Sequence, residues 1–212
     1  MRQLAFFIAL SVPLLGQAPD TSAVLRAVEK RYNSTTSLQA DFTLTLTERG
    51  RRHLPERGVL SLSKGTPSRM RWDYSSPAGD FFLSDGKFVY DYDKLKNEVT
   101  RYPYRETEDL RIPLSFLLGK LDFNKDFERF NASRDGDSTL IAMIPRNKKV
   151  GFREISITVG PDSAIRRVVV TDPPGTLVME YVLGVEQRNV KVAEALFKFA
   201  QPPGSQVVDV RQ

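Results

Sequence analysis

Apolar and polar residues alternate along most of this chain, and a period of two is typical of half-buried β-strands. The alternation is clearest from Leu38 to Thr47, where Leu, Ala and Phe take turns with Gln, Asp and Thr. Similar alternation predicts further strands over residues 60–62, 69–74, 81–83, 88–92, 96–102, 127–133, 139–144, 155–159, 168–170, 177–183 and 197–199. The Asp85-Gly86 pair between two of these runs is a signal for a tight hairpin turn.

Two stretches depart from this period and favour helices. Residues 21–38 place apolar side chains about one helical turn apart, and Asp20 or Thr21 is suited to cap the start. Residues 106–121 contain Pro113, which suits a first helical turn, and a compact run of Leu and Phe follows it. The sequence therefore predicts a mainly β protein with two helical segments.

The strand number and the hairpin spacing predict an incomplete, unclosed antiparallel β-barrel. About eleven strands of this kind tend to curve towards closure, because an open edge invites pairing with other chains. We expect the helices to lie against the mouth or the concave face of this sheet. No repeat, linker or low-complexity tract divides the chain, so residues 19–212 are predicted to form a single domain.

Residues 1–18 are predicted to be a cleaved signal peptide. Arg2 precedes an apolar run over residues 4–10 that is too short to span a bilayer, and Gly16 and Ala18 are small residues where a signal peptidase reads. The alternative is an uncleaved N-terminal anchor. Because no Cys stands at the expected cleavage point after Ala18, we expect an exported product without a lipid anchor.

Composition removes most enzyme chemistry. The 212 residues include no Cys and one His, His53, which excludes disulfides, Cys/His zinc sites, thiol nucleophiles and any triad that does not use His53. His53 stands in a polar connection and is interpreted as a solvated loop residue. Asp91 and Asp93 alternate with tyrosines and are interpreted as the solvent face of a strand rather than an acid pair. The sequence predicts no cofactor and no metal site.

The charge balance is mildly basic, with 31 Lys and Arg against 26 Asp and Glu and a net charge of +5. No block of Lys and Arg is dense enough to predict nucleic-acid binding. Six arginines nevertheless gather in one region, either as a solvated strand face or as a docking surface for an acidic partner or headgroup. They are Arg49, Arg51, Arg52, Arg57, Arg69 and Arg71.

Short motifs in a fixed order carry a family resemblance. They are Arg31-Tyr32-Asn33, Leu38-Gln39-Ala40-Asp41-Phe42-Thr43, Gly58-Val59-Leu60, Met70-Arg71-Trp72-Asp73-Tyr74, Ser84-Asp85-Gly86-Lys87, Pro113-Leu114-Ser115-Phe116-Leu117-Leu118-Gly119, Asp126-Phe127, Asn189, Phe197-Lys198-Phe199 and Pro202-Pro203-Gly204. Each motif is weak alone, but their order and spacing are specific. From about Thr21 to Val210 the chain resembles the periplasmic outer-membrane lipoprotein carriers of the LolA family.

The resemblance implies an unclosed β-barrel with an α-helical lid over a hydrophobic cavity that shelters lipoprotein acyl chains. On this basis we expect apolar strand residues to line the cavity: Phe42, Leu44, Leu46, Leu60, Leu62, Met70, Trp72, Phe81 and Leu83. Alternation alone does not distinguish such a lining from an ordinary core. We expect Leu114, Phe116, Leu117 and Leu118 to form the lid, and Arg69 and Arg71 to contribute to partner docking.

The resemblance also implies partners. They are diacylated or triacylated lipoproteins, an inner-membrane ABC-type complex that releases them and the outer-membrane receptor LolB; the carrier itself is expected to be a periplasmic monomer. One position departs from the family. The resemblance implies an arginine directly before the proline of this segment, tying the lid to the barrel. In this chain Thr66 precedes Pro67. The alternatives are an envelope lipid-binding sensor or regulator of the same fold and, on weaker grounds, a secreted hydrolase.

Overall fold

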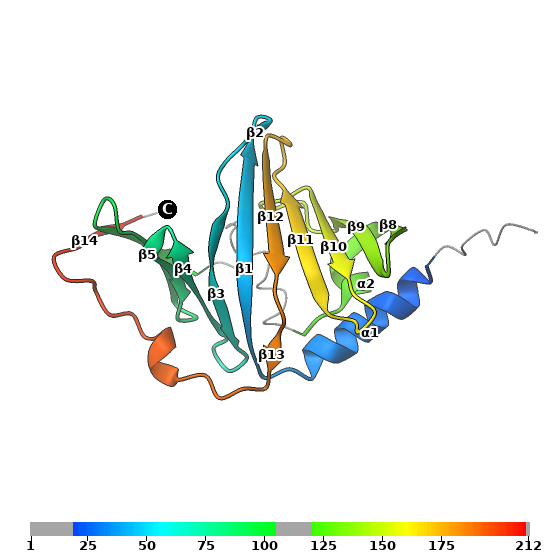
Figure 1. Cartoon of the computed structure of the whole chain (residues 1–212), viewed down its shortest axis with the longest axis horizontal. Coiled ribbons are helices and arrows are strands. Elements are labelled where there is room, and N and C mark those ends of the chain that lie inside the picture. The colour runs from blue at the N-terminus through cyan, green and yellow to red at the C-terminus, as the bar shows by residue number, and fades with distance from the viewer. Residues whose placement is uncertain (1–18, 105–119, 211–212) are drawn as a thin grey trace, which may run out of the picture.

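The strands form one strongly curved sheet (Figure 1). The computed structural model describes residues 19–104 and 120–210. In chain order the elements are α1 (Thr21–Asn33), β1 (Ser37–Glu48), β2 (Arg51–Arg52), β3 (Glu56–Ser63), β4 (Arg69–Ser76), β5 (Ala78–Ser84), β6 (Phe88–Asp93), β7 (Glu98–Pro103), α2 (Phe123–Asp126), β8 (Phe127–Asp135), β9 (Ser138–Pro145), β10 (Glu154–Val159), β11 (Ile165–Thr171), β12 (Leu177–Leu183), β13 (Gln187–Arg188), the 3-10 helix η2 (Glu194–Phe197) and β14 (Gln206–Asp209).

The strand order is β14-β7-β6-β5-β4-β3-β1-β12-β11-β10-β9-β8, with β2 and β13 also paired to β1. Neighbours are antiparallel except for β14, which runs parallel to β7. Within the described residues β14 and β8 end this order, so the predicted mainly β, unclosed antiparallel sheet is confirmed. At β8 the pairing with β9 shifts between Glu128 and Asn131, and Arg129 adopts a positive φ of 54°.

Helix α1 begins where the sequence predicts and ends earlier. The amide of Ala23 donates to Asp20 Oδ1 at 3.0 Å, as expected for the helix cap. The helix stops at Asn33, and Thr35 Oγ1 donates to the carbonyl of Arg31 at 2.9 Å. The predicted extension to residue 38 is therefore wrong, because the chain turns there and enters β1.

The hairpin between β5 and β6 forms at Asp85-Gly86. The amides of Lys87 and Phe88 both donate to Asp85 Oδ1 at 2.7 Å, and Gly86 has a φ of +90° that suits glycine. The predicted strand over residues 197–199 is wrong: η2 ends at Phe197. Phe197 and Phe199 alternate with Lys198 because both rings pack on the sheet, not because the segment pairs with a strand.

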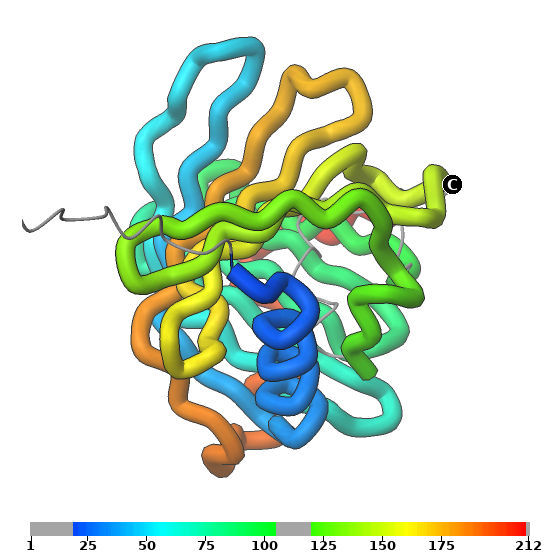
Figure 2. The backbone as a smooth tube through the Cα atoms, turned by 90° about the vertical axis from the view of Figure 1, so that its right-hand side faces the viewer, coloured from blue at the N-terminus to red at the C-terminus, as the bar shows by residue number. Residues whose placement is uncertain are grey.

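The curvature brings side chains from distant strands together on the concave side. Trp72 on β4 and Tyr181 on β12 are separated by β3 and β1 in the sheet, yet their ring centroids are 5.4 Å apart. Adjacent strands are about 4.8 Å apart, so a flat sheet would keep these rings much further from each other. The concave face is therefore closed over its own side chains. Figure 2 shows α1 in front of this curved sheet.

Two groups of buried apolar residues result. The inner cluster contains Leu25, Val28, Tyr32, Leu38, Ala40, Phe42, Leu44, Leu60, Leu62, Met70, Trp72, Phe82, Val89, Leu121, Phe123, Phe127, Ile141, Met143, Ile155, Ile157, Val159, Ile165, Val168, Val170, Met179, Tyr181 and Leu183. The outer cluster contains Phe81, Leu83, Tyr90, Tyr92, Val99 and Phe197. Over residues 19–104 and 120–210, no helix has the length and apolar character needed to cross a membrane.

Candidate functional site

Six of the predicted cavity residues lie together on the concave face. Phe42 and Leu44 come from β1, Leu60 and Leu62 from β3, and Met70 and Trp72 from β4; each is 3% exposed or less. Their alternation along three neighbouring strands puts them on one side of the sheet. Leu46 is partly buried and packs against the same cluster. The structure thus brings together seven of the nine residues in one apolar surface.

Phe81 and Leu83 are not part of this surface, and the prediction that they share it is wrong. In the pairing of β4 with β5, Trp72 lies opposite Phe82 while Arg71 lies opposite Leu83. Residues directly opposite each other point to the same face, so Phe82 joins the inner cluster and its two neighbours point outwards. Phe81 and Leu83 are buried in the outer cluster instead.

The other half of the inner cluster comes from strands that the sequence does not connect to the site. Strands β9 to β12 contribute Ile141, Ile157, Val168 and Tyr181, among others, on the same concave face. Their alternation is visible in the sequence, but nothing in the pattern shows that these strands curl back to meet β1, β3 and β4. Helix α1 also contributes, through its buried apolar side chains.

The inner cluster is tightly closed around aromatic rings. Phe42 packs edge-on against Trp72 with ring centroids 4.7 Å apart and against Tyr74 at 5.2 Å. A groove of about 400 Å³ opens beside β1, β3 and β12, and of the predicted cavity residues only Phe42 lines it. The concave surface is therefore present as buried apolar contact rather than as an open cavity between the described residues.

One polar side-chain atom of the inner cluster has no hydrogen-bond partner among the described residues. Trp72 Nε1 is buried, and none of the described residues accepts a hydrogen bond from it. A buried indole N–H normally finds an acceptor. Trp72 therefore combines a large apolar face with an unused donor at the centre of the candidate site.

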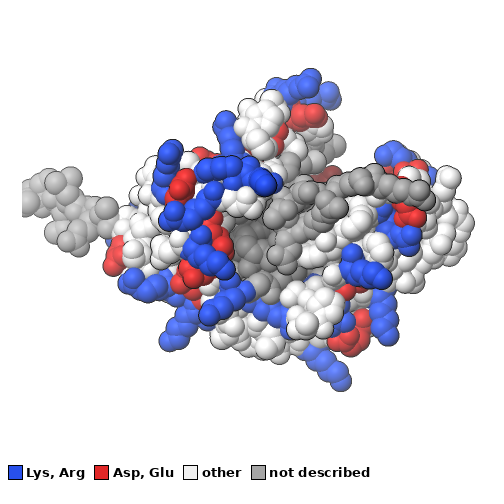
Figure 3. Space-filling model, turned by 180° about the vertical axis from the view of Figure 1, so that it is seen from behind, with Lys and Arg blue, Asp and Glu red and all other residues white. Residues whose placement is uncertain are grey.

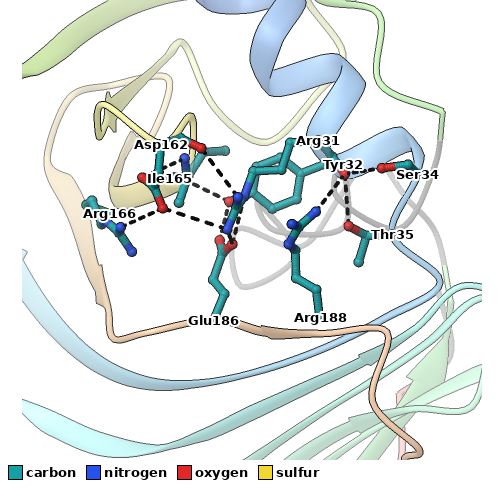
Figure 4. Close-up of polar contacts among 10 residues, drawn as sticks. Arg31, Tyr32, Ser34, Thr35, Asp162, Ile165, Arg166, Glu186 and Arg188 are labelled. Carbon is teal, nitrogen blue, oxygen red and sulfur yellow. Dashed lines mark hydrogen bonds and ion pairs between the residues drawn. The ribbon is translucent and has the colours of Figure 1, made fainter.

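A buried carboxylate holds α1 against the sheet (Figure 4). Glu186 follows β12 and its side chain is 0% exposed; it accepts hydrogen bonds from Arg31 Nη2 at 2.8 Å and from the hydroxyl of Tyr32. The same hydroxyl accepts the amide of Ile165 at 2.8 Å. The network joins residues 155 positions apart and fixes the C-terminal end of α1.

This network shifts the pKa values of its members. Burial would lower the pKa of Arg31, but the hydrogen bond and the negative charge of Glu186 outweigh it and raise that pKa above its usual value. For the Tyr32 phenol the effect of burial is the opposite: burial is the main cause that raises its pKa, and the negative charge of Glu186 raises it further. Arg31 therefore stays charged and Tyr32 stays protonated at neutral pH.

Helix α1 also holds the chain that leads into α2. The side-chain amide of Asn33 donates to the carbonyl of Leu121 at 2.9 Å and accepts the amide of Leu121 at 2.7 Å. Glu29 Oε1 accepts the amide of Phe123 at 2.8 Å. Lys64, in the turn that contains Thr66, donates to the carbonyl of Tyr32 at 2.6 Å. The lid residues Leu114, Phe116, Leu117 and Leu118 lie outside the described residues.

Arg69 and Arg71, predicted to contribute to partner docking, make contacts within the chain. Both approach the strap, as we call residues 189–209, which crosses the outer face. Arg69 makes two hydrogen bonds to Glu194 at 2.5 and 3.0 Å, and these raise the pKa of Arg69 and lower that of Glu194. Arg71 donates to the carbonyl of Leu196 at 3.3 Å and stacks over the ring of Phe81 at 4.8 Å. The two guanidinium groups thus hold the strap.

The strap is also held by apolar contacts. Phe197 is 2% exposed in the outer cluster, and Phe199 stacks on Tyr90 with ring centroids 4.1 Å apart and an angle of 6°. At its end, Asp209 accepts two hydrogen bonds from Arg101 at 2.6 and 2.8 Å. This segment is what covers the outer cluster, and its contacts are too distant in sequence for local patterns to predict.

Replacing Phe197 by Ala is expected to loosen the strap. Loss of a buried phenyl ring costs about 3 kcal/mol or more, so the backbone amides of β14 should exchange hydrogen about a hundredfold faster. Hydrogen exchange followed by mass spectrometry measures this directly. Val208→Ala is the matched control, because Val208 on β14 is 38% exposed and should change little. Equal exchange rates in the Phe197 variant and the wild type would contradict the role given to Phe197.

On the face seen in Figure 3, positive and negative side chains are mixed rather than gathered in one block of a single sign. Figure 3 shows several groups of Lys and Arg on one face with Asp and Glu among them. Glu128, for example, lies 3.0 Å from Lys148 and 3.7 Å from Arg146. Such pairs reduce the local positive field.

Comparisons with known proteins agree with the sequence motifs. The family model of the outer membrane lipoprotein carrier protein LolA matches residues 33–200. An outer-membrane lipoprotein carrier protein of Nitrosomonas europaea is 25% identical over 208 residues, covering 98% of this chain and 99% of its own length. One from Bordetella avium is 29% identical over 209 residues, covering 98% of this chain and 96% of its own.

Solved structures support the fold. The crystal structure of an uncharacterized conserved protein from Thermus thermophilus matches with a TM-score of 0.51 at 16% identity, covering 91% of this chain and 100% of that one. At this identity the likeness concerns the fold alone. The family match spans most of the chain and agrees with the curved, unclosed sheet and its apolar concave face. The chain therefore belongs to the LolA family of outer-membrane lipoprotein carriers, which are not enzymes.

Proposed function

We propose that this protein carries lipoproteins through the periplasm by sheltering their acyl chains on the inner cluster. The observation that carries this proposal is the continuous apolar surface formed by β1, β3 and β4, whose six central residues are 3% exposed or less. A carrier of this kind needs an apolar surface that water does not reach when the protein is empty. The closed inner cluster supports such a resting state.

The energetics favour exchange over tight binding. Shielding one acyl chain of about fifteen methylenes is worth roughly 12 kcal/mol, at about 0.8 kcal/mol each. At this value, the summed free energy of shielding two or three acyl chains would exceed the practical limit of about 20 kcal/mol for non-covalent binding. Part of this gain must therefore be offset by breaking the contacts that close the empty protein. The ring contacts of Phe42, Trp72 and Tyr181 are suited to this role.

Several finer parts of the proposal rest on the sequence pattern, for the signal peptide and the single domain, and on the family resemblance, for the lid and the partners. They are the cleaved signal peptide at residues 1–18, the single carrier domain, the lid formed by Leu114, Phe116, Leu117 and Leu118, receipt of cargo from an inner-membrane ABC-type complex and delivery to LolB. In this proposal the lid yields as acyl chains enter against the concave face. Thr66 stands where the resemblance implies an arginine, so in this proposal other contacts close the empty state. Those of Asn33 with Leu121 and of Lys64 with Tyr32 support such a closure.

Mass spectrometry of material extracted from the protein after purification from the periplasm tests the function. We expect diacylated or triacylated lipoprotein in amounts comparable to the protein. We also expect the purified carrier to release newly made lipoproteins from spheroplasts. A protein that carries no lipoprotein and releases none above a buffer control would contradict the proposal. A co-purifying signalling partner would favour the sensor, and turnover of a substrate would favour the hydrolase.

A further inference from the structure

The unpartnered donor of Trp72 points to a specific feature of the cargo. The indole is 2% exposed, and its Nε1 has no acceptor among the described residues. Its partners across the strand pairs are Leu60 on β3 and Phe82 on β5. Phe42 packs edge-on against its ring at 4.7 Å. These three side chains are hydrocarbon and cannot accept a hydrogen bond.

A water molecule is a poor candidate for the missing acceptor. A buried water needs two to four polar partners, and the side chains of Leu60, Phe82 and Phe42 offer none. Tyr181, whose ring lies 5.4 Å from that of Trp72, carries a hydroxyl, but this hydroxyl already donates to Met179 Sδ at 3.9 Å. A hydrocarbon chain alone would also leave the donor unused. An acyl chain differs from a plain hydrocarbon chain by the carbonyl group at its head, which is a good acceptor in an apolar surrounding.

We infer that Trp72 Nε1 donates a hydrogen bond to the ester or amide carbonyl of an acyl chain bound on the inner cluster. This inference rests on the proposed function, because it requires acyl cargo at that surface. The donor is already buried and has no acceptor among the described residues, so a hydrogen bond to the cargo contributes to binding. Trp72 thus recognises the acyl linkage, while its neighbours contact the chains.

The chain has a single tryptophan, so its fluorescence reports on this site alone. We would titrate the purified protein with a synthetic dipalmitoyl-glyceryl lipopeptide and with its dialkyl ether analogue, which keeps both chains but lacks their carbonyls. We expect the ester ligand to bind about tenfold more tightly and to shift the tryptophan emission to the red. The ether ligand should bind without this shift.

Trp72→Phe keeps an aromatic ring and removes the donor. In this variant we expect the ester and ether lipopeptides to bind equally, as measured by isothermal titration calorimetry. Comparing the two ligands cancels the effect of lost ring volume, since both ligands contact the same ring. Phosphatidylglycerol with the same chains distinguishes the source of the carbonyl: an equal red shift assigns recognition to any acyl ester, and a shift with the lipopeptide alone assigns it to lipoproteins.

Two results would overturn the inference. If the wild-type protein binds ester and ether lipopeptides equally and with the same emission, the indole makes no hydrogen bond to a carbonyl, although the proposed carrier function stands. If neither ligand binds to the wild type, the inference and the acyl-binding surface both fail.

Discussion

Replacing Met70 by Glu is expected to abolish the release of lipoproteins from spheroplasts. Met70 is fully buried in the inner cluster, on β4 and opposite Leu62 of β3, within the three strands that supply the acyl surface. A carboxylate facing hydrocarbon must lose its hydration or take up a proton, and either costs several kcal/mol. We therefore expect release to fall at least about tenfold, as measured by immunoblotting of the released lipoproteins.

Leu83→Glu is the matched control for this experiment. Leu83 is also 0% exposed but belongs to the outer cluster, so the same change in charge lowers stability without touching the acyl surface. The milder pair Met70→Gln and Leu83→Gln removes less stability and keeps the comparison between folded proteins. Folding is checked by circular dichroism. A folded Met70→Gln protein that releases as much lipoprotein as Leu83→Gln would refute the assignment of Met70.

Replacing Glu186 by Ala is expected to lower the free energy of unfolding by about 3–5 kcal/mol. The carboxylate is fully buried and pairs with Arg31 and Tyr32. Its loss leaves a largely buried guanidinium and a buried hydroxyl without their common acceptor, which is more costly than losing an exposed ion pair. Urea denaturation followed by far-UV circular dichroism measures the change.

Glu154→Ala is the control, since Glu154 is an exposed residue at the start of β10 and should change stability by less than about 0.5 kcal/mol. Tyr32→Phe combined with Glu186→Ala closes a double-mutant cycle. Because the hydroxyl and the carboxylate act together, the effects of the two single changes should not add. Strictly additive effects, or a loss below about 1 kcal/mol for Glu186→Ala, would argue against a role for this network in holding α1.

The sequence predicted best where local chemistry decides the structure. The alternation from Leu38 to Thr47 gives β1, and the Asp85-Gly86 pair gives the turn before β6. The same alternation places Phe42, Leu60 and Trp72 on one face. In each case the signal and its structural consequence lie within a few residues of each other.

The pattern failed where both faces of a strand are buried. Phe81, Phe82 and Leu83 are consecutive apolar residues, and a period of two cannot show which of them faces inwards. The register with β4 decides it, and that register shifts between Asp73 and Ser75. Periodicity carries no information on such a shift.

Long-range partners were also beyond local patterns. Arg69 meets Glu194 from 125 positions away, and nothing around Arg69 indicates a carboxylate on the strap. An isolated arginine on a strand is equally compatible with solvent, a partner protein or an internal ion pair. Only the path of the strap across the outer face distinguishes them.

The irregular edge strand β8 affects whether copies of this protein can pair with one another through their sheet edges. A straight edge strand offers a continuous row of amides and carbonyls on which another chain can add. The shifted pairing between Glu128 and Asn131 and the positive φ of Arg129 interrupt that row near the start of the strand. A second copy therefore finds no unbroken template along the whole of β8, which disfavours polymerisation through this edge.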